Sequence, residues 1–107
     1  MIEQSELGWR LTGAMRIANA ATLLQTGRDF LRAAIAAKAA SGSQEVVIDL
    51  IAVQETDSSA LGVLFAWLRT AQQSGLRLKI ANIPPTMLSQ AELYGVLDAL
   101  PLVPLRA

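Results

Sequence analysis

The chain has 107 residues, of which 52% are hydrophobic and 17% are charged, and its nine basic and nine acidic side chains cancel. This length and composition indicate one folded domain and exclude an intrinsically disordered chain. Because cysteine and histidine are both absent from the sequence, disulfides, thiol chemistry, the usual zinc sites and histidine-based triads are excluded. The charges are scattered singly, which argues against a nucleic-acid-binding surface.

The sequence offers no membrane-targeting signal. Its first four residues lack the basic start and apolar core of a signal peptide. The longest predicted helical region, residues 23–40, is too charged to cross a bilayer, since it is interrupted by Arg28, Asp29, Arg32 and Lys38. We therefore expect a cytoplasmic protein.

The N-terminal third predicts strands followed by one long helix. Residues 9–17 alternate with a period of two, which indicates a half-buried strand, or two short strands bent at Gly13. Residues 2–5 are expected to add a short edge strand. Thr22-Leu23-Leu24-Gln25 has the spacing of a capping box, so the helix is predicted to begin there and to end at Ser41-Gly42-Ser43. Its predicted inner face consists of Leu24, Gly27, Leu31, Ala34, Ile35 and Lys38.

The central third predicts a strand, a helix and a second strand. Residues 46–50 are almost continuously apolar and β-branched, which is typical of a strand covered on both faces. Polar residues 56–59 then precede a helical pattern that ends near Ser74-Gly75, and residues 76–80 form the next strand. Such a βαβ unit predicts two parallel strands, with the start of the helix near the carboxyl end of a central strand, where open α/β sheets usually place function.

The C-terminal third predicts a second, shorter helix. The loop at residues 82–86 leads into a helix that is expected to be capped by Thr86 and to close at Gly95 as its left-handed residue. The apolar residues 96–105 are expected to form a short helix or an extended segment that covers the edge of the core.

The central helix has apolar residues on two sides. Leu61, Leu64, Phe65 and Leu68 lie within one narrow arc and are expected to face the sheet. Val63 and Trp67 fall near the opposite side, which is unusual for a solvated surface. Two interpretations stay open: a neighbouring helix covers Trp67, or the two side chains form an apolar patch that binds another protein.

The segment Thr56-Asp57-Ser58-Ser59 is the main candidate site. Asp and Ser are good helix caps, so capping alone explains part of it. Only one of these side chains can cap, however, and the other hydroxyls would stand at the positive end of the helix, where a phosphate or a partner's acceptor is stabilised. Phosphorylation of Ser58 or Ser59 would add close to two negative charges there.

The remaining polar residues do not predict catalysis. Asp49 ends an apolar strand, and we expect it to be solvated or bonded to local amides. Glu55 and Asp57 are two residues apart in a predicted loop, too ordinary an arrangement for an acid/base pair. No glycine-rich run is followed by Lys-Ser or Lys-Thr, so no phosphate-binding loop is predicted. We expect no metal or cofactor.

Several segments together resemble one known family. Leu11-Thr12-Gly13, the strand at residues 46–50, Asp57-Ser58-Ser59-Ala60-Leu61-Gly62 and Gly75-Leu76-Arg77-Leu78 are similar to a STAS domain. That family comprises the anti-sigma-factor antagonists and the cytoplasmic domains of sulfate transporters. The resemblance implies a single α/β domain over residues 1–107, with a small, mixed, mostly parallel sheet packed with helices.

The end of the chain resembles one branch of this family. Residues 88–96, followed by Leu100-Pro101, are similar to MlaB proteins, which are stand-alone STAS subunits of a phospholipid-transporting ABC complex. The resemblance implies a non-enzymatic subunit that binds the cytoplasmic ATPase (MlaF), with a permease in the same complex, and that supports outer-membrane lipid asymmetry from the inner membrane. In that branch the hydroxyl after the signature aspartate contacts the ATPase, and this position is Ser58. The expected partner-binding surface is Thr56, Asp57, Ser58, Ser59, Val63 and Trp67.

The antagonist branch gives the alternative. Its phosphorylated serine matches Ser59, although Ala60 stands where that branch usually has glycine. This resemblance implies a partner switch in which an anti-sigma kinase phosphorylates the chain. MlaB proteins generally have no hydroxyl at the Ser59 position, so both alternatives stay open. A small enzyme is the least favoured class, because it could use only carboxylates and hydroxyls.

Overall fold

A four-stranded sheet forms the centre of the molecule, seen in a computed structural model that describes residues 2–5, 8–41 and 45–103. In spatial order its strands are β1 (Ile2–Ser5), β2 (Gly8–Leu11), β4 (Glu45–Asp49) and β6 (Arg77–Ala81). β1 runs antiparallel to β2, whereas the β2–β4 and β4–β6 pairs are parallel. The predicted mixed, mostly parallel sheet and the parallel βαβ strands are therefore confirmed.

The chain bends out of this sheet at Gly13, as predicted. Gly13 has φ +102°, a conformation that glycine adopts readily. The next strand, β3 (Gly13–Met15), pairs in parallel with β5 (Val53–Thr56) in a separate two-stranded sheet. The sequence did not predict β5, because Gln54 and Glu55 are exposed and the segment has no apolar alternation.

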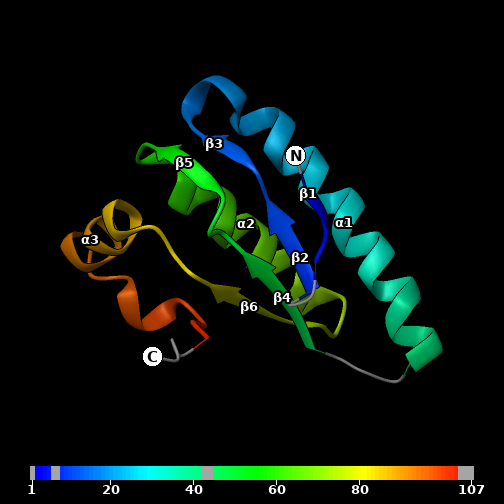
Figure 1. Ribbon diagram of the computed structural model, residues 1–107. Coiled ribbons are helices and arrows are strands. Elements are labelled where there is room, and N and C mark those ends of the chain that lie inside the picture. The colour runs from blue at the N-terminus through cyan, green and yellow to red at the C-terminus, as the bar shows by residue number, and fades with distance from the viewer. Residues whose placement is uncertain (1, 6–7, 42–44, 104–107) are drawn as a thin grey trace.

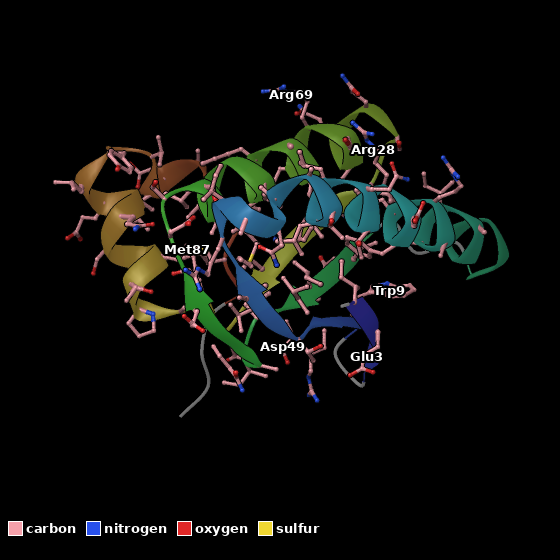
Figure 2. All side chains as sticks on the ribbon, turned by 90° about the horizontal axis from the view of Figure 1, so that it is seen from above. Glu3, Trp9, Arg28, Asp49, Arg69 and Met87 are labelled. Atoms are coloured by element: carbon pink, nitrogen blue, oxygen red, sulfur yellow. The ribbon has the colours of Figure 1, made fainter. Side chains whose placement is uncertain are left out.

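Two long helices cover one face of the strands. Figures 1 and 2 show α1 (Ala20–Ser41) and α2 (Ser59–Gln73) side by side over that face, and within the described residues the opposite face carries no helix. α2 ends where predicted, with Ser74 after its last residue and Gly75 at φ +75°. Neither helix is long and apolar enough to span a membrane, nor is any other helix in the described ranges.

The start of α1 differs from the prediction. A 3₁₀ turn, η1 (Ile17–Asn19), leads directly into the helix at Ala20, so Thr22 already lies inside the helix and caps nothing. The side chain of Asn19 instead secures the turn: it accepts from the Arg16 amide at 2.9 Å and donates to the Ala14 carbonyl at 2.8 Å.

The buried face of α1 is also shifted from the predicted one. Leu24 is half-buried and Ile35 is 37% exposed, whereas Leu23 and Phe30, which were not predicted to face inward, are buried. Gly27, Leu31 and Ala34 face inward as predicted. The helix ends at Ser41 as expected, while the side chain of Lys38 and the residues Gly42 and Ser43 lie outside the described part of the chain.

The C-terminal segment closes one end of the molecule. α3 (Pro85–Leu93) starts one residue before Thr86, so the prediction that Thr86 caps it is wrong. Its end is as predicted, with Gly95 at φ +71°. A short 3₁₀ turn, η2 (Leu97–Ala99), then leads to Leu102, which forms a parallel bridge with Ile80 on β6. This confirms the expected cover over the core edge, up to the last described residue, 103.

Candidate functional site

The candidate site lies where β3 and β5 end and α2 begins. Met15 pairs with Thr56 at the ends of the two parallel strands, and the Asp57 amide donates to the Met15 carbonyl at 3.1 Å. The short β3–β5 sheet therefore holds the start of α2 against the turn that leads into α1 (Figure 1). The site was expected at the carboxyl end of a central strand. It lies at the carboxyl ends of parallel strands, but these are β3 and β5 of the separate two-stranded sheet, because β5 comes between β4 and α2.

Both carboxylate oxygens of Asp57 are occupied. Oδ1 accepts from the Ser59 amide at 2.9 Å and from the Ser59 hydroxyl at 2.5 Å. Oδ2 accepts from the Ile17 amide at 2.9 Å. These donors, the Ser59 hydroxyl first and then the Ile17 amide, lower the pKa of Asp57 below its ordinary value of 3.8. Asp57 is therefore the residue that caps α2 and also joins it to η1.

The two serines are in different environments. Ser59 is half-buried, and its hydroxyl is engaged by Asp57. Ser58 is exposed, has helical backbone angles (φ −62°, ψ −20°) and makes no side-chain capping bond. Among the described residues its hydroxyl has no hydrogen-bond partner, so it can bind an external group without breaking an internal contact.

Thr56 connects the site to α3. Its hydroxyl lies 3.0 Å from the hydroxyl of Thr86, in the first turn of α3. Thr56 is half-buried and Thr86 is exposed. Thr56 is thus at the candidate site, as expected, but its hydroxyl already has an internal partner.

Val63 and Trp67 are not part of an exposed patch, and that expectation is wrong. Their side chains are 3% and 1% exposed, because α1 packs against this side of α2. The indole nitrogen of Trp67 donates to the Leu23 carbonyl at 3.2 Å, and its ring meets Phe30 edge-on at a centroid distance of 6.0 Å. The alternative interpretation, a neighbouring helix covering Trp67, is correct.

Two residues beside Ser58 escaped the sequence-based prediction. Ile17 is 74% exposed although its own amide is bound to Asp57, which places an apolar side chain next to the site. Gly62 is exposed one helical turn after Ser58, and a β-carbon there would meet open space. The strand-like alternation around Ile17 predicted the wrong environment, because the chain leaves β3 and turns before this residue.

Charged groups near the site pair with one another. Arg16 Nη1 lies 3.3 Å from Glu55 Oε2, an exposed pair of small energetic weight.

Asp49, at the end of β4, is only 2% exposed and accepts from the Ile51 amide and from the Asn82 side chain, both at 2.9 Å. The expected bonding to local amides is confirmed for Asp49, and the solvated alternative is wrong. Within the described residues, no cluster of three or more acidic side chains could hold a metal ion.

Comparison with known proteins identifies the family. A family model described as "Mlab, STAS domain" matches residues 2–104. The chain belongs to the STAS domain family. A search of proteins with curated descriptions finds no match to this STAS domain.

Solved structures share the fold of this STAS domain. A putative anti-sigma factor antagonist from Thermotoga maritima is 17% identical with a TM-score of 0.70, covering 98% of this chain and 86% of its own. An anti-sigma factor antagonist from Mycobacterium paratuberculosis is 23% identical with a TM-score of 0.62, covering 98% and 84%. Unphosphorylated SpoIIAA is 14% identical with a TM-score of 0.58, covering 99% and 88%. At these identities the likeness concerns the fold.

Proposed function

We propose that this STAS domain is a non-catalytic subunit that binds the cytoplasmic ATPase of a phospholipid-transporting ABC complex through the start of α2. The main support is the exposed Ser58 hydroxyl, which has no internal partner among the described residues, while Asp57 and Ser59 satisfy each other. The description of the matching family model, which names the MlaB branch, supports this choice of partner. Such a subunit would be held at the inner membrane by the transporter.

The neighbouring surface suits a protein partner. Ile17 supplies exposed apolar area beside Ser58. One turn further along α2, Gly62 has no side chain, so the backbone of the helix is accessible there. A partner backbone can approach a helix closely at a glycine. The proposed contact surface is therefore Ser58, Ile17 and Gly62, with Asp57 holding η1 and α2 together from behind.

The test is co-purification of the ATPase with a Ser58→Arg variant. A long cation at this position would be desolvated against the partner, so we expect binding to weaken about tenfold or more. The matched control is Ser74→Arg, an exposed serine at the other end of the same helix, which should bind like the wild type. Equal recovery of the ATPase with Ser58→Arg and with Ser74→Arg would count against the proposed surface.

A phosphorylation switch is the second candidate. It is favoured by the fold shared with anti-sigma factor antagonists and by the Ser59 hydroxyl at the helix start. A phosphate on Ser59 would replace the bond to Asp57 and bring two negative groups together, whereas the amide groups of α2 would stabilise it. Incubation with an anti-sigma kinase and ATP should then add one phosphate, and Ser59→Ala should abolish it. The transporter proposal predicts no such modification.

A further inference from the structure

An apolar groove lies between β6, α3 and the C-terminal segment, and nothing above assigns it a role. Its volume is about 380 Å³. Apart from Asn82, only apolar side chains line it, chiefly Ile83, Pro85, Leu88, Leu102 and Val103. Leu88 is 37% exposed on α3, so the groove is open on that side.

A second groove continues this surface across the same loop. It has a volume of about 290 Å³ and shares Asn82, Ile83 and Pro85 with the first, adding Ile51, which is 61% exposed. Asn82 has φ +55°, and its side chain is bonded to the buried Asp49 at 2.9 Å. The loop between the grooves is therefore fixed before any ligand binds, which lowers the entropic cost of binding.

An exposed acidic side chain on α3 lies beside the first groove. Glu92 is exposed one helical turn from Leu88, and Asp98 is exposed on η2, which packs against α3. From residue 80 to residue 103 the sequence contains these two acids and no lysine or arginine. The nearest cations before this segment, Arg77 and Lys79 on β6, line a separate groove together with Ala99 and Pro101. Other exposed arginines lie on the two long helices, where Figure 2 labels Arg28 and Arg69.

We propose that the first groove binds a basic amphipathic helix of a partner protein. Its apolar side chains would enter the groove beside Leu88, while lysines or arginines along its edge would face Glu92. Anionic phospholipid headgroups are disfavoured, because Glu92 at the groove edge repels them. A second copy of the chain fits poorly. Its basic helix would have to be α1, which carries exposed arginines, but among the described side chains of α1 Ile35 is the single large apolar one that is exposed.

This proposal is independent of the function proposed above, since Ser58 does not line the groove. The test uses the full-length chain labelled with ¹⁵N and a short amphipathic peptide of leucine and lysine as the probe. We expect amide shifts on α3 and residues 100–103, together with a measurable Kd. A leucine–glutamate peptide of the same pattern, and vesicles of anionic lipid, should not bind.

Variants separate the apolar contact from the charge contact. Leu88→Asp should raise Kd about tenfold, since it places a charge in the groove. Glu92→Lys should raise Kd about threefold at low salt, with a smaller effect at high salt. The matched control is Glu3→Lys, the same charge reversal at the opposite end of the molecule, where Figure 2 shows Glu3 far from Met87 of α3. It should leave Kd unchanged.

Several outcomes would overturn the proposal. One is a Kd for Glu92→Lys equal to that for Glu3→Lys; another is peptide-induced shifts confined to α1 and α2. Equal binding of the acidic peptide or of anionic vesicles would show that the groove prefers a different ligand. Light scattering that shows concentration-dependent association, lost in Leu88→Asp, would assign the groove to a second copy instead.

Discussion

Gly27 and Trp67 determine how closely α1 and α2 approach each other. A β-carbon at Gly27 would lie 1.8 Å from the indole nitrogen of Trp67, far inside contact distance. Trp67 is 1% exposed and bonded to the Leu23 carbonyl, so it cannot move aside cheaply. The tryptophan that the sequence placed at a possible docking surface is thus accommodated by a glycine on the neighbouring helix.

This contact predicts that Gly27→Ala is destabilising. Overpacking of a rigid core typically costs about 1–3 kcal/mol, more than alanine gains as a better helix former. Urea unfolding should show a lower midpoint with an unchanged slope. The matched control is Gly62→Ala, where a β-carbon meets open space and the free energy of unfolding should rise by about 0.5–1 kcal/mol. A neutral Gly27→Ala would contradict the close packing of the two helices.

Asp57 predicts a pH-dependent stability. Its folded pKa lies below its ordinary value of 3.8, so its charged form stabilises the fold above that value. This contribution should disappear as the pH falls through the lower, folded pKa. Asp57→Asn should therefore lower the free energy of unfolding near neutral pH, with the difference from wild type shrinking in acid.

The measurement is urea unfolding across a series of acidic pH values. Ser59→Ala is the companion variant, since the Ser59 hydroxyl is the largest cause of the lowered pKa. It should remove part of the same pH dependence. If Asp57→Asn keeps the pH dependence of the wild type, the proposed role of this carboxylate in joining η1 to α2 is wrong.

At the scale of elements, strong apolar patterns predicted structure well and polar contacts did not. The strand β4 and the helix α2 were both predicted close to their observed bounds, because their apolar residues are continuous or periodic. β5 was missed because its exposed residues carry no such pattern. The caps at Thr22 and Thr86 were wrong because each threonine lies inside its helix, where the side chain or carbonyl bonds elsewhere.

The same contrast holds for the candidate site: its place in the chain could be predicted, but its polar contacts could not. Its position at the start of α2 could be predicted from chain order alone, and Ser58 and Ser59 are there. Which serine is free could not be predicted, because that depends on the Asp57 bonds to Ser59 and to Ile17, 40 residues away in sequence. The burial of Trp67 also depends on α1, whose inner face was predicted one position out of register at Leu24.

Asp49 joins three elements, and this predicts a cost for its removal. It accepts from Ile51 and Asn82, and its Oδ2 lies 3.7 Å from the partly exposed Arg10 on β2. Asp49→Ala leaves partly buried donors without their acceptor, so we expect a loss of about 1–3 kcal/mol in the free energy of unfolding. The exposed Asp98→Ala should stay within about 0.5 kcal/mol of the wild type. If Asp49→Ala also stays within about 0.5 kcal/mol of the wild type, the bonds to Asp49 contribute little to stability.

At the scale of the molecule, the layers place two surfaces on different parts of the chain. The start of α2 with η1 presents Ser58 and Ile17, and α3 with β6 presents the apolar groove beside Leu88. The two surfaces are neighbours, because the Thr56 hydroxyl before α2 lies 3.0 Å from the Thr86 hydroxyl of α3. Two separate surfaces suit a small subunit that contacts more than one segment of a larger complex. Both proposed surfaces therefore concern assembly with other proteins.

The most direct test is to purify the tagged chain from its native cells and to identify what accompanies it. The proposed transporter role predicts recovery of an ABC-type ATPase together with an integral membrane permease, both reduced in Ser58→Arg and retained in Ser74→Arg. Recovery of a lone kinase-like protein, with a phosphate on Ser59 of the purified chain, would contradict it.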